Sequence, residues 1–492
     1  MIKRALILAD GSTGGYTSSL RSLGPTAVKE KLSQNNWEHE LIEHTLTWGE
    51  KINSIATTYF KDADKKLLIF STSVGDWSAK CENTIEFIKD KIPDVKVIIG
   101  GIRGVQKGPQ DRYYRKNFDA VFLGRAMEMF DDYLKEQDTA KYIKIKDAPY
   151  YINPVDDFTI EKPIASDYLK ESDFVNDKDV VGFELGLGCK FNCTFCNFPY
   201  RNFKEVVMLP EDAMVHSMQT SYDRFGIKNF FVADDTANEN MEKLELLVRA
   251  VKRLSFTPNI GGFVRLDVIS KKPEQIQLLK EANFMSFFFG VETFNDKASK
   301  IIRKKHSITA VKETLRKIKQ EIPHSWSSVA CIMGLEGDDL DTMFEDLMDL
   351  IKENLIQNVE MASLNLKPKN NFILGDGDFF SEMEKDPEKF GIKLEASGEW
   401  KNSNTSLTKV KEDFNRSDFK QFLKDKYYHN FNGFTYLNLL SLGLVEQYEN
   451  ADVVRDRMNN GSLQKEFMLS LNREISKYIS KKNNYIQEHY GT

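Results

Sequence analysis

Short apolar runs recur through the first 140 residues, and most of them end in glycine or a small polar residue. The runs cover residues 4–10, 66–71, 95–99 and 118–123. Two segments of helical character, residues 24–34 and 82–91, lie between them. This alternation is typical of an open parallel α/β sheet, in which ligands bind at the carboxyl ends of the strands. The pattern predicts such an edge where Ser71, Gly100 and Gly124 end their strands.

A second alternation, between residues 181 and 368, contains six further apolar runs. They cover residues 181–187, 229–233, 259–264, 284–291, 327–333 and 359–364. Six strand–helix units predict a partial (β/α)6 barrel, whose active-site residues belong at the carboxyl ends of the strands. Residues 141–180, rich in Lys, Asp and Pro, are predicted to be a linker. Residues 369–492 are predicted to be a mainly helical C-terminal region, whose aromatic residues either form a core of their own or cover the barrel mouth.

Composition excludes several classes of protein. With 41% hydrophobic and 29% charged residues, the 492-residue chain is expected to fold rather than to stay disordered. No uncharged apolar run approaches the roughly 18 residues of a membrane span, so no membrane partner is expected. The net charge of −6 gives no overall attraction for nucleic acid. Charge comes too early in the N-terminal apolar run for a signal peptide, so we expect a cytoplasmic protein.

Three of the five cysteines lie within eight residues, as Cys189, Cys193 and Cys196. Three thiolates in this C-x3-C-x2-C spacing can hold three irons of a four-iron four-sulfur ([4Fe-4S]) cluster and leave the fourth iron open. A structural zinc site needs four ligands, and no fourth cysteine is near. A redox pair at 193 and 196 would leave Cys189 unexplained. The spacing therefore predicts a [4Fe-4S] cluster.

The same cysteines, with Phe195 before the last of them, resemble the signature of the radical S-adenosylmethionine (SAM) enzymes. Four downstream elements resemble the later strand ends of that superfamily, in the expected order. They are residues 231–235, Arg265 with Asp267, residues 290–293, and residues 332–337, where Glu336 replaces the usual proline. The resemblance covers about residues 181–368.

This resemblance implies that the open iron binds SAM. One electron from a reductant protein, such as flavodoxin or ferredoxin, would then release a 5′-deoxyadenosyl radical. The implied cofactor contacts are Phe195, Asp234, Arg265 and Glu292. Residue chemistry leaves their roles open, because Arg265 could pair with the carboxylate of SAM or with Asp267. Glu292 could accept hydrogen bonds from SAM or from barrel backbone, and Asp234 could contact a ligand or cap the following helix.

The N-terminal region resembles the cobalamin-binding domain of the cobalamin-dependent branch of this superfamily. Residues 10–15 fall where that branch commonly has D-x-H-x-x-G, with Ser12 in place of the histidine. The resemblance implies cobalamin bound along Ser12, Ser71, Gly100 and Gly124, without a histidine ligand from this loop. A degenerate domain that only packs on the barrel or recognises a partner is the alternative.

Together these resemblances imply a radical SAM enzyme, and most simply a cobalamin-dependent methyltransferase acting on an unactivated carbon. A cobalamin-independent mutase, cyclase or oxidase is an alternative within the same superfamily. A non-catalytic binding protein with a structural cluster is an alternative from another class. A methylthiotransferase is disfavoured, because Cys81 and Cys331 stand alone and offer no second cluster. The sequence predicts no particular substrate.

Overall fold

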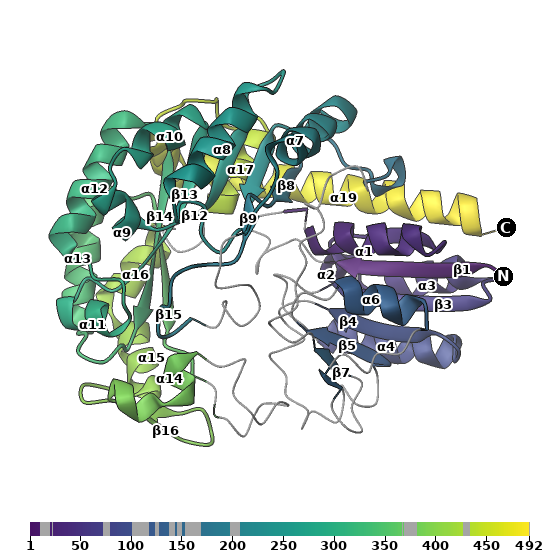
Figure 1. The fold of residues 1–492 in the computed structure, drawn as a ribbon, viewed down its shortest axis with the longest axis horizontal. Helices are drawn as coiled ribbons and strands as arrows, with labels where there is room; N and C mark the ends of the chain where they lie inside the picture. Colours follow the sequence, from purple (N-terminus) through teal and green to yellow (C-terminus); the bar gives the residue numbers. More distant parts are fainter. Residues whose placement is uncertain are drawn as a thin grey trace.

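The computed structural model contains two mainly parallel sheets, each flanked by helices, with helices from the last part of the chain beside both (Figure 1). The structure describes residues 1–9, 20–21, 23–71, 79–100, 118–123, 127–136, 143–144, 150–152, 169–196, 207–366, 368, 381–426 and 433–491. No helix within these ranges is long and apolar enough to cross a membrane.

The N-terminal unit is built on a seven-stranded sheet with the order β2-β1-β3-β4-β5-β7-β6. Its strands are β1 (Lys3–Ala9), β2 (Glu38–Ile42), β3 (Lys65–Ser71), β4 (Lys96–Gly100), β5 (Ala120–Leu123), β6 (Ile143–Lys144) and β7 (Tyr150–Ile152). Its helices are α1 (Leu23–Gln34), α2 (Thr45–Trp48), α3 (Lys51–Phe60), α4 (Ala79–Lys91) and α6 (Met127–Leu134). All pairings are parallel except that of β6 with β7. Buried apolar residues dominate β1, β3 and β4, as expected for parallel strands covered on both faces.

Three strands of this sheet are absent from the sequence prediction. β2 has the sequence Glu-His-Glu-Leu-Ile, in which His39 and Glu40 are buried although their side chains are polar. β6 and β7 lie between residues 143 and 152, inside the expected linker, and β7 pairs with β5. The sheet therefore extends beyond residue 140, while the proposed domain boundaries at 180 and 368 stay predictions.

The central unit is a six-stranded, fully parallel sheet with the order β15-β14-β13-β12-β11-β8. Its strands are β8 (Val180–Phe183), β11 (Asn229–Val232), β12 (Asn259–Val264), β13 (Phe284–Glu292), β14 (Trp326–Met333) and β15 (Asn358–Ser363). Its helices are α7 (Glu211–Phe225), α8 (Met241–Lys252), α9 (Leu266–Lys271), α10 (Gln275–Glu281), α11 (Asp296–Ile301), α12 (Ile308–Glu321) and α13 (Leu340–Lys352). All six predicted strands are confirmed. β8 and β15 are edge strands, so the barrel is partial.

Helix α17 (Gly433–Ser441) packs on the face of this sheet opposite the outer helices. Ser286 of β13 donates a hydrogen bond of 2.9 Å to the carbonyl of Gly433. The ring of Tyr436 stacks on Trp326, with centroids 5.4 Å apart. Phe434 packs on Phe231 of β11, with centroids 4.1 Å apart. These C-terminal aromatic residues therefore join the inner core of the barrel instead of forming a core of their own.

The rest of the C-terminal region is mainly helical. It contains α14 (Glu382–Lys385), β16 (Lys393–Leu394), β17 (Trp400–Lys401), α15 (Leu407–Arg416), α16 (Asp418–Asp425), α18 (Ala451–Asn459) and α19 (Ser462–Tyr490). The yellow helix α19 runs back beside the N-terminal unit, so both chain ends lie on the same side (Figure 1). Tyr490 at its end packs edge-on against Tyr59 of α3, with centroids 4.8 Å apart.

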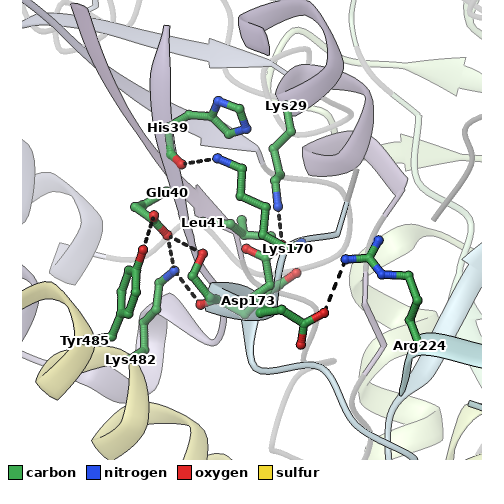
Figure 2. A network of polar contacts seen from close by, with 12 residues as sticks. Lys29, His39, Glu40, Leu41, Lys170, Asp173, Arg224, Lys482 and Tyr485 are labelled. Atoms are coloured by element: carbon green, nitrogen blue, oxygen red, sulfur yellow. Dashed lines mark hydrogen bonds and ion pairs between the residues drawn. The ribbon is translucent and has the colours of Figure 1, made fainter. Parts of the chain in front are cut away.

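A buried polar network joins α19, the N-terminal sheet and the segment that precedes β8 (Figure 2). Lys482 donates to the carboxylate of Glu40 at 2.5 Å and to the carbonyl of Ser172 at 2.8 Å. Lys29 of α1 forms an ion pair with Asp173. Both lysines are fully buried, and buried charges are tolerated only when they are paired in this way. The network therefore fixes the N-terminal unit against the barrel.

Arg21 makes a second connection between the two units. Its backbone forms an isolated parallel bridge with β8, donating to Val180 at 2.8 Å and accepting from Gly182 at 3.2 Å. Its guanidinium pairs with Asp179 at 2.9 Å and lies 4.7 Å from the ring centroid of Tyr478 in α19. The segment that enters α1 is thus attached to the first barrel strand.

Candidate active site

The three clustered cysteines lie on one loop after the first barrel strand, as predicted. Short strand β9 (Gly186–Leu187) pairs with β10 (Val207–Met208), and Gly188 turns the chain with a φ of 96°. Only glycine adopts such a φ at little cost. Cys189, Cys193 and Cys196 follow as half-buried thiols without disulfide partners. The backbone amide of Cys196 donates to the carbonyl of Cys193 at 3.1 Å, which closes the loop.

The cysteines share a cavity of about 180 Å³ with the carboxyl ends of β12 and β13. The other predicted site residues that line it are Phe195, Arg265 and Glu292. Asp235 and Lys304 complete its charged rim, and Phe263 and Phe288 form an aromatic wall. The structure therefore brings six of the predicted site residues together at the strand ends where an active site is expected.

Contacts from distant segments hold the cysteine loop in place. Thr194 donates to the carbonyl of Ile301 at 3.1 Å and accepts from the amide of Met383 at 3.0 Å. Arg303 donates to the carbonyl of Asn192 at 3.0 Å and binds Glu382 in bidentate fashion at 2.6 and 2.7 Å. The loop is thus preorganised by residues that the cysteine motif does not contain.

Asp234 does not line the cavity, which corrects its expected role as a ligand contact. Its carboxylate accepts hydrogen bonds from the backbone of Leu185 and Gly186, at 2.9 and 3.1 Å. It also pairs with Lys243 at 2.5 Å, and Lys243 pairs with Glu239 at 2.6 Å. All three charged side chains are buried, and burial raises the pKa of Asp234 despite the lysine. Asp234 therefore anchors the backbone leading into the cysteine loop, while its neighbour at 235 faces the cavity.

Arg265 is held between a carboxylate and a thiol. It donates two hydrogen bonds to Asp267, at 3.0 and 2.9 Å, and a third to the sulfur of Cys193 at 2.9 Å. The guanidinium lies 3.9 Å from the ring centroid of Phe191, and Asn238 accepts from its backbone amide at 2.8 Å. Of the two pairings left open by the sequence, the structure contains the one with Asp267. A fixed positive charge consequently stands beside the cysteine loop.

Glu292 adopts a strained backbone conformation at the end of β13, with a φ of 73°. The strand loses register with β14 just before it, between residues 290 and 292. Its half-buried carboxylate lies near Lys304, with 3.6 Å between Oε1 and Nζ, and desolvation raises the pKa of Glu292. Lys304 also donates to the carbonyl of Gly290 at 2.8 Å. A side chain at Gly290 would place its Cβ 2.6 Å from Oε1 of Glu292, so only glycine leaves room for this arrangement.

Lys304 and Phe191 are site residues that the sequence prediction missed. Lys304 belongs to a basic run at 303–305 that is indistinguishable from a solvated loop. Its place in the cavity depends on the fold bringing the loop after α11 back onto β13. No local signal in the sequence marks it.

The unusual Glu336 has a structural explanation. It accepts hydrogen bonds from the backbone and hydroxyl of Ser403, at 3.1 and 2.6 Å, and from Lys297 at 3.3 Å. Nearby Gly334 has a φ of 92° and lies so close to Trp400 that a Cβ would come within 2.3 Å of the indole. The carboxylate thus ties the C-terminal region to the end of β14.

The expected cobalamin contacts are only partly described. Ser71 and Gly100 end the neighbouring strands β3 and β4 and lie opposite each other in register. Ser71 also lies beside α1, because a Cβ on Gly24 would be 3.1 Å from its hydroxyl. Ser12 and Gly124 lie outside the described residues. The described half of the predicted edge therefore has its strand ends side by side, and its ligand stays a prediction.

The donor set fits an iron–sulfur cluster. Within the described ranges, no three His, Cys, Asp or Glu side chains converge closely enough to bind one metal ion. Cluster ligands need no such convergence, because each cysteine binds a different iron. Three thiols that form no disulfide among the described residues lie on one cavity wall, and with the cation of Arg265 beside them they provide anionic ligands and a compensating charge.

Comparison with known proteins agrees with this geometry. Residues 183–351 match the sequence model of the radical SAM superfamily. The chain is 29% identical over 191 residues to the hopanoid C-2 methylase of Rhodopseudomonas palustris strain TIE-1, which covers 37% of this chain and 35% of that protein. It is 21% identical to the tRNA-2-methylthio-N(6)-dimethylallyladenosine synthase of Natranaerobius thermophilus, over 57% of this chain and 59% of that protein. The matches thus span between a third and three fifths of these relatives.

Two solved structures share the fold over most of the chain. The radical SAM methyltransferase TsrM of Kitasatospora setae has a TM-score of 0.65 at 11% identity, over 94% of this chain and all of that one. The cobalamin-dependent SAM radical enzyme OxsB has a TM-score of 0.59 at 12% identity, over all of this chain and 84% of that one. At this identity the likeness concerns the fold alone. The matched residues 183–351, which contain the cysteine loop, are therefore a radical SAM domain.

Proposed function

We propose that the protein is a cobalamin-dependent radical SAM methyltransferase that acts on an unactivated carbon. The observation that carries the proposal is the loop of three closely spaced cysteines, which line one cavity with Arg265 and Glu292. The N-terminal parallel sheet supports the cobalamin part, because its strand ends form the kind of edge at which α/β sheets bind ligands. The fold likeness to TsrM and OxsB supports the same combination of domains.

In this proposal each cavity residue has a distinct task. Cys189, Cys193 and Cys196 would hold three irons of the cluster, whose remaining iron would bind SAM. Glu292 accepts hydrogen bonds from SAM, with its carboxylate oriented by Lys304. Arg265 supplies a positive charge beside the cluster, in a position fixed by its two hydrogen bonds to Asp267.

Further contacts orient and shield the bound groups. Phe195 provides an apolar surface for SAM, and Phe263 and Phe288 exclude water from the deeper cavity. When bound, the cluster and SAM supply an organic radical that removes a hydrogen atom from the substrate, and cobalamin supplies the methyl group. The electron is proposed to come from a flavodoxin or ferredoxin, with the protein working in the cytoplasm.

The proposal is tested by loading the protein with its expected cofactors. Anaerobically reconstituted protein should contain about four irons per chain and should release 5′-deoxyadenosine from SAM. After incubation with hydroxocobalamin and desalting, it should retain cobalamin; once this is reduced to the Co(II) form, its electron spin resonance should show no nitrogen ligand, because Ser12 replaces the histidine of the loop. Loss of all cobalamin with SAM cleavage intact would favour a cobalamin-independent radical enzyme.

A prediction about SAM follows from the position of Glu292. Glu292→Gln should weaken SAM binding by about tenfold to hundredfold, because a charged acceptor becomes a neutral one. Its iron content should stay at the wild-type value. Glu336→Gln is the matched control, since Glu336 also follows a barrel strand but bonds Ser403 outside the cavity. Equilibrium dialysis against SAM and iron analysis check both, and equal SAM affinity in the two variants would contradict the assignment.

A further inference from the structure

The inner face of β14 carries a polar side chain beside the cavity. Val329, Cys331 and Met333 belong to the core beneath the outer helices, whereas Trp326 packs on Tyr436 of α17. Since side chains alternate along a strand, Ser328 points to the same inner side as Trp326. Ser328 lies directly opposite Phe288 in register, and Phe288 lines the cavity.

The last strand, β15, continues this row. Val359 belongs to the outer core, so Asn358 and Glu360 lie on the inner face. Asn358 lies opposite Ser328 in register. One row of side chains on the inner face therefore crosses β12, β13, β14 and β15. Its side chains are aromatic at Phe263 and Phe288 and polar at Ser328 and Asn358.

The polar end of this row has no hydrogen-bond partners. Ser328 and Asn358 are both 0% exposed. In the described part of the chain, neither the hydroxyl of Ser328 nor either amide atom of Asn358 has a partner. Native proteins satisfy nearly all buried polar groups, so three orphaned atoms side by side need an explanation. By contrast, Asn259 at the start of β12 bonds Asn229 at 2.9 Å and Gln447 at 2.7 Å.

The polar end of the row lies deeper in the barrel than the exposed end of β15. Exposure rises along its inner face, from buried Asn358 through half-buried Glu360 to exposed Ala362. β15 is also the edge strand, farthest from β8 and the cysteine loop. Because Asn358 is fully buried, a ligand that enters over Ala362 reaches it only when the side chains that cover it move, while another part of the ligand lies over Phe288.

We propose that Asn358 and Ser328 form the polar end of the substrate subsite and bind a neutral amide group. The primary amide of Asn358 offers one donor and one acceptor side by side, which complements a second amide. Glu360 is the next inner-face residue toward the barrel mouth, and its carboxylate would repel an anionic ligand. This inference rests on the proposed function: the amide end fixes the substrate so that its apolar carbon lies over Phe288, toward the cysteine loop.

The unpaired side chains of Ser328 and Asn358 are expected to lower the stability of the protein when no ligand is bound. Asn358→Leu, of similar volume, should raise the Tm of the reconstituted protein by about 1–3 °C, because an unpaired amide is replaced by an apolar group. Ser328→Ala should raise it less and serves as the milder variant. Asn259→Leu, which breaks a partnered amide on the same sheet, should lower it. A lower Tm for both Asn358→Leu and Ser328→Ala would show that these groups are satisfied by water or protein and would overturn the proposal.

Ligand binding gives the second readout. In saturation-transfer NMR with SAM-loaded protein, butyramide should bind the wild type, lose its signal with Asn358→Leu and keep it with Asn259→Leu. Butyrate should give no signal. Butyramide signals of equal size in wild type and Asn358→Leu, or binding of butyrate at the same strength, would overturn the assignment. Neither readout requires methyl transfer, so the amide subsite and the proposed function can fail separately.

Discussion

Cys193→Ala protein, reconstituted anaerobically with iron and sulfide, should hold almost no [4Fe-4S] cluster and should not cleave SAM. The loop provides three thiols for three irons, and removal of the central one leaves two that cannot fix the cluster. Arg265 would also lose the sulfur that it contacts at 2.9 Å. Iron and sulfide analysis, the visible absorbance of the cluster and assay of 5′-deoxyadenosine measure the effect.

The matched control is Cys331→Ala. Cys331 is buried on the outer face of β14, where burial raises the pKa of its thiol well above the usual range. It should therefore stay protonated, and its loss should leave iron content and SAM cleavage in place. Wild-type cluster content in Cys193→Ala would refute the assignment, as would stoichiometric zinc without iron in anaerobic wild-type protein.

Lys243→Met should lower the free energy of unfolding by about 3 kcal/mol, because it leaves the carboxylates of Asp234 and Glu239 buried without their cation, and protonation relieves only part of this cost. Urea denaturation followed by circular dichroism measures this. Lys252→Ala is the control on the same helix: Lys252 is exposed, pairs with Glu281 at 2.7 Å, and should contribute less than about 1 kcal/mol.

The mechanism behind this loss can be checked separately. Adding Asp234→Asn and Glu239→Gln to Lys243→Met removes both uncompensated charges and should restore part of the stability. Equal losses for Lys243→Met and Lys252→Ala would contradict the buried-triad account. A loss of stability without any loss of reconstituted iron would contradict the role of Asp234 in holding the backbone that leads to the cysteines.

The sequence predicts the barrel well because its strands are buried on both faces and stand out as apolar runs. β13, with its run of phenylalanines, is an example. β2 escapes the same logic, because the buried carboxylate of Glu40 is satisfied by partners that come from Ser172 and from Lys482 of α19. Such partners lie more than a hundred residues away in the chain and leave no local pattern.

Within the site, the sequence locates strand ends better than it assigns individual side chains. Residues 234 and 235 are both aspartates, and only the fold shows that the first is buried beneath the loop and the second lines the cavity. Nothing in the sequence marks the unpaired amide of Asn358, since an asparagine at the start of a strand gives no functional signal. What matters there is the lack of a partner in the described structure.

The contacts of α19 with the N-terminal unit affect how the protein folds during translation. The N-terminal sheet leaves the ribosome long before α19, which carries both Lys482, the partner of Glu40, and Tyr490, which covers Tyr59. Until then the apolar face of α3 has no cover from Phe467 and Ile475. The nascent chain is therefore expected to need chaperone protection until α19 has been synthesised, since exposed apolar surface promotes aggregation. Ribosomes stalled before α19 should yield nascent chains whose N-terminal sheet is sensitive to protease.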